Sequence, residues 1–282
     1  MNRIGVRGHD FGKMSIKDLP STLRALGFQA AQLAPAKAFE GVNSFEDITE
    51  HVLEQCREEF LKNDIEISVY GCYVEIGERE HDKRRQQVEQ FIRGMHHCKR
   101  IGARLIGTET TQFPLAGENR EAAFQGLKDS VLRIAEEAHR QDVLIGIEPV
   151  ALHTLNTPEL TARLLSEVNS DHVKIILDPV NLFTLDNIGK SEQIIDACFQ
   201  AFGDRIEVLH LKDITMITKD HGDTIQKVND TFKWESIGEG IVNYQQILRY
   251  VKDKNVSLIR EEASILNYQT DLKNIQALLN SI

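Results

Sequence analysis

Four groups able to ligate a metal follow apolar segments in the second half of the chain. The segments are rich in Val, Ile and Leu, and they end at Glu148 in VLIGIEPV, Asp178 in VKIILDPVN, His210 in EVLHLKD, and Glu261 or Glu262 in NVSLIREEAS. Carboxylate oxygens with one imidazole suit a hard divalent cation such as Mn²⁺, Mg²⁺ or Co²⁺, whereas a structural zinc site commonly recruits cysteine. These residues predict a metal site if the fold brings them together.

Short apolar runs alternate with helical patterns along the whole chain, and such runs are typical of parallel strands that are buried on both faces. The expected strands lie near residues 3–8, 29–34, 65–71, 103–109, 143–148, 173–178, 206–212 and 256–261. Eight strand-and-helix units without a break in composition predict an α/β fold, a (β/α)8 TIM barrel in which residues 1–282 form one domain. In such a barrel the carboxyl ends of the strands converge on one mouth, so the ligand groups would share a site.

The composition is that of an ordinary globular protein. A chain of 282 residues that is 41% apolar and 27% charged suits a single α/β barrel. The net charge of −10 argues against nucleic acid as a partner, because binding a phosphate backbone needs clustered Lys and Arg. The four cysteines have no CxxC spacing, which favours reduced, buried thiols. Without a signal pattern or a long apolar stretch, we expect a cytoplasmic protein that does not bind membranes.

Two connections between the expected elements are longer than the others. One follows the fourth strand, in GTETTQFPLAGENRE, and the other spans residues 213–240 after the seventh strand. Long connections in a compact domain are usually functional or mobile. Because both follow the carboxyl ends of strands, we expect them at the rim of the mouth.

The motifs of the second half resemble those of a known family. IEP, LDPVN, HLKD and IGEG occur in the order and spacing found in the sugar isomerase and epimerase barrels related to xylose isomerase and to the endonuclease IV DNA-repair enzymes. The resemblance covers the whole chain in fold and residues 143–262 in motif. It implies that Glu148, Asp178 and His210 bind the metal together with one Glu at the end of the eighth strand.

Two glutamates compete for that fourth position. Because side chains alternate along a strand, only one of Glu261 and Glu262 can point into the mouth. If Glu261 does so, Ile259 lines the barrel and Arg260 faces the helices, whereas Glu262 would bring Arg260 inward. The apolar pair Leu258-Ile259 matches the apolar residues before the family's Glu, which favours Glu261 and leaves Glu262 as the alternative.

The resemblance implies a metal-dependent isomerase or epimerase of a keto sugar, polyol or sugar phosphate. One divalent cation, Mn²⁺ before Mg²⁺, Co²⁺ or Zn²⁺, would polarise the carbonyl, and the reaction would pass through a cis-enediolate. Glu148 and Glu261 are the implied acid and base pair. Other residues near the expected strand ends are candidates for binding the substrate, namely His9, Glu109, His153, Asn181 and Lys212.

Several alternatives stay open. A dehydratase on the same metal site would share the proton abstraction but expel a hydroxyl group, and a binding barrel would keep the fold without catalysis. An endonuclease IV-like nuclease is disfavoured, because Asn181, Phe232 and Trp234 stand where that branch has ligands for additional zinc ions. Related barrels often associate, so a homo-oligomer is compatible with the sequence, although no segment marks an interface.

Overall fold

The computed structural model describes residues 2–113, 119–216, 232–262 and 266–282. Within these residues, eight parallel strands close into a barrel in the order β1-β10-β7-β6-β5-β4-β3-β2, with β2 paired to β1. The strands are β1 (Ile4–Arg7), β2 (Ala30–Leu33), β3 (Glu66–Gly71), β4 (Leu105–Glu109), β5 (Leu144–Glu148), β6 (Val173–Leu177), β7 (Ile206–Leu211) and β10 (Ser257–Arg260). The expected (β/α)8 TIM barrel is confirmed, and each end of each predicted strand lies within two residues of the observed one.

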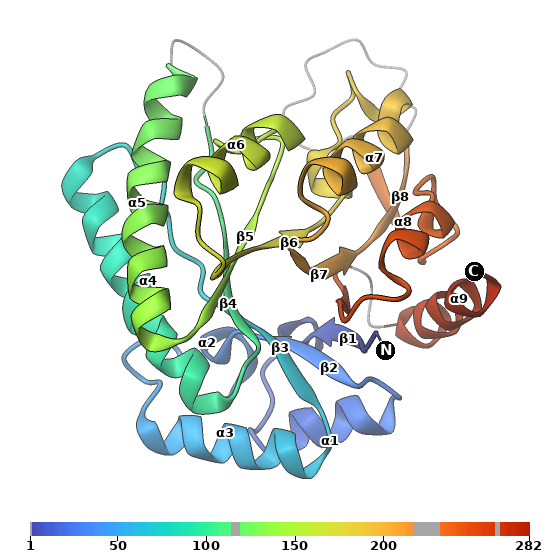
Figure 1. Ribbon diagram of the computed structural model, residues 1–282. Helices are drawn as coiled ribbons and strands as arrows, with labels where there is room; N and C mark the ends of the chain where they lie inside the picture. Colours follow the sequence, from blue (N-terminus) through green and yellow to red (C-terminus); the bar gives the residue numbers. More distant parts are fainter. Residues whose placement is uncertain (1, 114–118, 217–231, 263–265) are drawn as a thin grey trace.

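Helices surround the strands as an outer layer (Figure 1). They are α1 (Asp18–Ala25), α3 (Glu50–Lys62), α4 (His81–Ile101), α5 (Arg120–Gln141), α6 (Pro158–Val168), α7 (Ser191–Phe202), α8 (Tyr244–Val251) and α9 (Tyr268–Ser281). Helix α6 illustrates how the sequence begins a helix: Thr157 Oγ1 accepts a hydrogen bond from the N–H of Leu160 at 3.2 Å, and Pro158 occupies the first helical position.

Some elements do not follow the simple alternation. A short helix, α2 (Pro35–Ala38), follows β2, and the long connection after β7 contains an antiparallel pair, β8 (Asp213–Met216) and β9 (Phe232–Glu235). Part of each long connection, residues 114–118 in the first and 217–231 in the second, lies outside the described residues.

The interior of the barrel is filled by one side-chain cluster, which consists of Ala30, Val69, Leu105, Leu144, Ile176, Val208 and Ile259. Glycines in β4 and β5 make room for the largest of these side chains. A Cβ atom at Gly107 would lie 2.5 Å from Ile176 Cδ1, and one at Gly146 would lie 2.8 Å from Leu105 Cδ1. The barrel is therefore a packed core beneath the mouth, and not an open channel.

A buried carboxylate anchors the chain just beyond β7. Asp213 accepts hydrogen bonds from the backbone N–H groups of Ile214, Gly238, Gly240 and Val242 at 2.9 to 3.1 Å. A Cβ atom at Gly240 would lie 2.1 Å from Asp213 Oδ1, so the turn requires glycine there. The HLKD and IGEG motifs thus form one structural unit that holds the end of β7 at the mouth.

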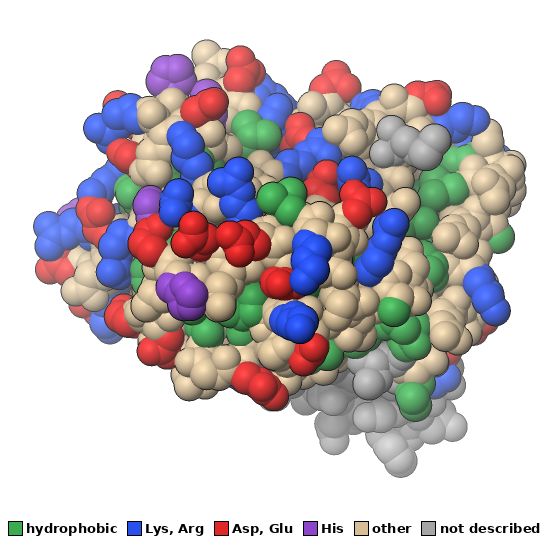
Figure 2. Space-filling view, turned by 90° about the horizontal axis from the view of Figure 1, so that it is seen from below, with side chains coloured by type: hydrophobic (Ala, Val, Ile, Leu, Met, Phe, Trp, Pro, Cys, Tyr) green, Lys and Arg blue, Asp and Glu red, His purple; other side chains and the backbone are tan. Residues whose placement is uncertain are grey.

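The surface is charged and mixed. On the face shown in Figure 2, acidic and basic side chains are interspersed over much of the area, with only small apolar areas between them. Among the helices of the described residues, none combines the length and apolar character needed to cross a membrane.

Candidate metal centre and active site

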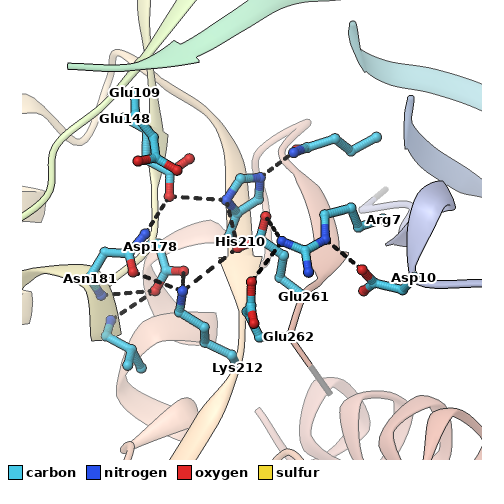
Figure 3. A network of polar contacts seen from close by, with 12 residues as sticks. Arg7, Asp10, Glu109, Glu148, Asp178, Asn181, His210, Lys212, Glu261 and Glu262 are labelled. Carbon is cyan, nitrogen blue, oxygen red and sulfur yellow. Dashed lines mark hydrogen bonds and ion pairs between the residues drawn. The ribbon is translucent and has the colours of Figure 1, made fainter. Parts of the chain in front are cut away.

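Four side chains from four strands converge at the mouth of the barrel. Glu148 ends β5, Asp178 directly follows β6, His210 lies near the end of β7, and Glu261 directly follows β10. One ligand atom from each residue lies within 4.8 Å of the others, and all four residues are buried. Figure 3 shows His210 between Glu148 on one side and Glu261 on the other. The structure therefore brings together the four residues that the sequence singled out.

His210 is fully buried, and its two ring nitrogens face different surroundings. Nδ1 lies 3.3 Å from Glu148 Oε1 and 3.7 Å from Glu261 Oε2, and within the described residues it makes no well-aligned hydrogen bond. Nε2 lies 2.6 Å from Gln32 Oε1. Burial by itself lowers the pKa of His210, but Glu261 and Glu148 outweigh it and raise that pKa to about 9. The surroundings of Nδ1 thus strongly favour a positive charge.

A lysine and an asparagine join the carboxylates on the β6 side of the site (Figure 3). Asp178 Oδ1 accepts the backbone N–H of Val180 at 2.9 Å, and Oδ2 lies 2.8 Å from Lys212 Nζ. Lys212 also donates to Asn181 Oδ1 at 2.8 Å, and Asn181 Nδ2 donates to Glu148 Oε1 at 2.6 Å. Burial raises the pKa of Asp178 to about 6 although Lys212 acts against this shift. Lys212 and Asn181 therefore orient two of the four candidate ligands.

The two glutamates after β10 have different positions. The side chain of Glu261 is 8% exposed and that of Glu262 is 40% exposed, and Arg7 Nη1 contacts both, at 3.2 Å and 2.9 Å. Arg260 points away from the mouth and pairs with Asp271 of α9. Glu261 thus lies among the other candidate ligands, and Glu262 lies at the rim.

The donor set fits a divalent cation. Three carboxylates and one imidazole are buried together, and among the described residues Lys212 and Arg7 are the lysine and arginine that form ion pairs with these carboxylates. Burying several like charges is costly unless opposite charge compensates them. A bound divalent cation would supply that charge, and it would also satisfy Nδ1 of His210.

Glu109 and His153 lie at the rim beside Glu148. Glu109 ends β4 in register with Glu148, its side chain is 44% exposed, and its Oε2 lies 3.7 Å from His153 Nε2. Burial, together with Glu148 and Glu261, raises the pKa of Glu109 to about 7. A carboxyl group with such a pKa can both give and take a proton near neutral pH.

His9 lies apart from the four candidate ligands. It is part of a 3₁₀ turn (Gly8–Phe11) after β1, and its ring meets Tyr73 edge-on with the ring centroids 6.1 Å apart. Burial, followed by Arg7 and Lys37, lowers the pKa of His9 to about 4, so the ring is neutral at neutral pH.

Sequence reasoning did not find three residues of the mouth. Arg7, at the end of β1, pairs with Asp10 at 2.6 Å as well as with the two glutamates after β10. Gln32 contacts His210 from β2. Its signal in the sequence is a single polar residue within the apolar run AAQLA, which a search for polar groups inside expected strands would have detected.

The family model of the xylose isomerase-like TIM barrel matches residues 21–274, so the chain belongs to this family, as the motifs indicated. No curated protein sequence matches the chain. Among solved structures, the chain is similar to 3-keto-D-glucoside 4-epimerase YcjR from E. coli, with 16% identity, a TM-score of 0.73 and 100% of both chains covered.

Two further structures resemble the chain along its whole length. The probable 3-DHS dehydratase AsbF from Bacillus anthracis is 21% identical, with a TM-score of 0.73 and 99% of both chains covered. The IolI protein with a bound zinc atom is 16% identical, with a TM-score of 0.77 and coverage of 99% of this chain and 98% of that one. At these identities the similarity shows a shared fold.

Proposed function

We propose that the protein is a divalent-metal-dependent isomerase or epimerase of a keto sugar, polyol or sugar phosphate. The observation that carries this proposal is the buried convergence of Glu148, Asp178, His210 and Glu261 at the mouth of the barrel. Structural neighbours that are sugar epimerases support the substrate class. A cation held by these four residues, Mn²⁺ being the first choice for an oxygen-rich set, would polarise the substrate carbonyl and acidify the neighbouring C–H bond.

Glu148 and Glu261 are the proposed acid and base. They come from opposite sides of His210, and each is oriented by another side chain, since Asn181 donates to Glu148 and Arg7 pairs with Glu261. One carboxylate removes the proton from the carbon beside the carbonyl, which leaves a cis-enediolate. Return of a proton to the other face of that carbon gives an epimer, and delivery to the neighbouring carbon gives an isomer.

The remaining candidates have supporting roles in this proposal. Lys212, which is 5% exposed, holds Asp178 and lies where it can donate to a substrate oxygen. Glu109 and His153 lie at the rim and the neutral ring of His9 follows β1 at the same end of the barrel, and in this proposal the three would hydrogen-bond the hydroxyl groups of a sugar.

A dehydratase is the second candidate, and Glu109 is the observation that favours it. In this reaction one carboxylate removes the proton beside the carbonyl, a double bond forms, and the β-hydroxyl leaves as water with a proton from a general acid. With its pKa raised to about 7, Glu109 is protonated often enough at neutral pH to act as that acid. The similarity in fold to a probable 3-DHS dehydratase supports the same possibility.

A nuclease with several zinc ions has less support. Asn181 is engaged with Glu148 and Lys212, and Phe232 is buried in the core, so neither position offers a ligand for an additional metal. The net charge of −10 also disfavours binding to a phosphate backbone.

Metal stoichiometry is the first test. Elemental analysis after loading with Mn²⁺ is expected to give about one ion per chain for the wild type and for His96→Ala, an exposed histidine of α4, but none for His210→Ala. The loaded enzyme is then incubated with a panel of ketoses in D₂O, and NMR detects deuterium uptake and separates epimer, isomer and dehydrated product. Two or three ions per chain would contradict the single-metal proposal, and a wild type without metal would refute it.

A further inference from the structure

We infer that Gln32 of β2 positions His210 for metal binding, a role that rests on the proposed metal site. Gln32 is 4% exposed and His210 is fully buried, and Gln32 Oε1 lies 2.6 Å from His210 Nε2. An amide oxygen can only accept a hydrogen bond, so Nε2 must carry the hydrogen in this contact.

This contact determines which ring nitrogen of His210 is free to bind. When Nε2 carries the hydrogen of a neutral imidazole, the lone pair lies on Nδ1. Nδ1 is the atom that faces Glu148 at 3.3 Å and Glu261 at 3.7 Å. Gln32 thus selects the tautomer and the ring orientation that a ligand to the shared cation needs.

The other end of the Gln32 amide contacts Tyr73. Gln32 Nε2 donates to Tyr73 Oη at 3.3 Å, which leaves Oε1 directed at His210. Lys37 Nζ lies over the Tyr73 ring, 3.5 Å from the ring centroid. On the protein backbone, a Cβ atom at Gly71 would lie 3.3 Å from the same ring, so the ring packs closely against this glycine. Rotation of the amide would exchange both of its partners.

The position of Gln32 explains why an uncharged acceptor suits this place. The four candidate ligands come from β5, β6, β7 and β10, whereas Gln32 reaches His210 from β2, which is three strands away from β7 around the barrel. A carboxylate at this position would add a fourth buried negative charge to the site. The amide oxygen orients the imidazole without that cost.

Two variants separate the hydrogen bond from packing. Gln32→Met keeps the length of the side chain but removes the acceptor, and Gln32→Glu keeps an acceptor for Nε2–H. In a titration that follows free Mn²⁺ by EPR, we expect Gln32→Met to bind the ion about 10- to 100-fold more weakly than the wild type. We expect Gln32→Glu to retain most of the wild-type affinity, because the bound cation compensates the added charge. The visible absorption of the Co²⁺-loaded protein is expected to change in Gln32→Met and to stay close to wild type in Gln32→Glu.

Gln29→Met is the matched control, because Gln29 is exposed and precedes the same strand. It should bind Mn²⁺ like the wild type, and circular dichroism of the metal-free variants checks that all of them fold. Wild-type affinity in Gln32→Met, or an equal loss in Gln32→Glu, would overturn the positioning role alone. A wild type that binds no Mn²⁺ would overturn the proposed function as well.

Discussion

The two ends of the barrel both gather polar side chains, but they balance charge differently. At the end formed by the amino termini of the strands, the hydroxyls of Ser68 and Ser257 contact each other and Glu66 Oε1 at 2.9 to 3.2 Å. Arg3 lies 3.3 Å from the other oxygen of Glu66. Here a carboxylate has one cation and two hydroxyl donors, so its hydrogen-bonding capacity is largely met.

A second carboxylate at the same end is equally well compensated. Glu207, in β7, pairs with Arg104 and lies 3.8 Å from Lys174 of β6. Arg104 also donates to the backbone carbonyl of Asn255, just before β10. These contacts join the neighbouring strands β6 and β7, connect the start of β4 to β7 and β10 across the barrel, and bring opposite charges together.

The mouth has the opposite balance. Glu148, Asp178 and Glu261 lie close together, with Glu109 in register beside Glu148, and within the described residues the cations that pair with members of this group are Lys212, Arg7 and the protonated ring of His210. The comparison teaches that the same fold pairs each of these carboxylates with a cation at one end and gathers more carboxylates than cations at the other. This imbalance is what suits the mouth to the cation proposed above.

The largest effect is expected from Glu261→Gln, which removes one proposed acid or base, and a charged ligand of the proposed cation, while keeping the shape of the side chain. Deuterium uptake by the substrate should slow by about 10²- to 10⁴-fold, the usual contribution of general acid–base catalysis. Glu262→Gln is the control, because Glu262 is 40% exposed at the rim, and it should react at nearly the wild-type rate. A similar loss in both variants would remove the distinction between these two residues.

Supplying a cation should stabilise the mouth and leave the other end unchanged. At a free Mn²⁺ concentration 100 times its dissociation constant, binding adds about 2.7 kcal/mol to the free energy of unfolding. Calorimetry should show a higher Tm with Mn²⁺ that returns to the starting value with EDTA. The same rise is expected in Ser257→Ala, whose substitution lies at the other end, and its absence there would show that the two ends are coupled.

The stability of the metal-free protein should depend on pH because of the same charge imbalance at the mouth. This effect should be smaller than that of the metal. The pKa values of Asp178, Glu109 and His210 are raised to about 6, 7 and 9. Groups whose pKa is raised by folding stabilise the protein at low pH and lose that contribution as the pH rises through the folded-state pKa. The pKa of Glu261 is lowered to about 2, mainly because His210 and Lys212 outweigh burial, and its contribution is lost only in acid.

The Tm without metal should therefore fall between pH 5 and pH 9. Saturating Mn²⁺ should stabilise the protein more strongly at the alkaline end of this range, because the metal compensates the ionised carboxylates. A Tm that rises with pH in the metal-free protein would contradict the proposed charge imbalance.

The smallest effect is expected at the end of the barrel that is formed by the amino termini of the strands. Ser257→Ala removes one hydroxyl from the contact with Ser68 and Glu66, and such a hydrogen bond contributes about 1 kcal/mol to stability. Unfolding in urea should detect this loss, and Mn²⁺ affinity should equal that of the wild type. A weaker affinity would mean that this end also shapes the metal site.

Much of the barrel could be predicted because the relevant signals are local. Buried strands appear as short apolar runs, and a parallel barrel places their carboxyl ends at one mouth, so Glu148, Asp178 and His210 could be grouped from the sequence alone. The pair β8 and β9 could not be predicted, because Asp213–Met216 and Phe232–Glu235 are short, of mixed polarity, and find each other across a long connection.

By itself, the sequence determined the eightfold alternation, the strand ends and the residue types available there, because periodicity and side-chain chemistry are properties of each segment. Only the tertiary structure decided which groups meet. It turned Glu261 inward and Arg260 outward, paired Lys212 with Asp178, and placed Gln32 against His210, which is 178 positions away. Such contacts depend on strand registers and on packing between distant segments, and no local pattern encodes either of them.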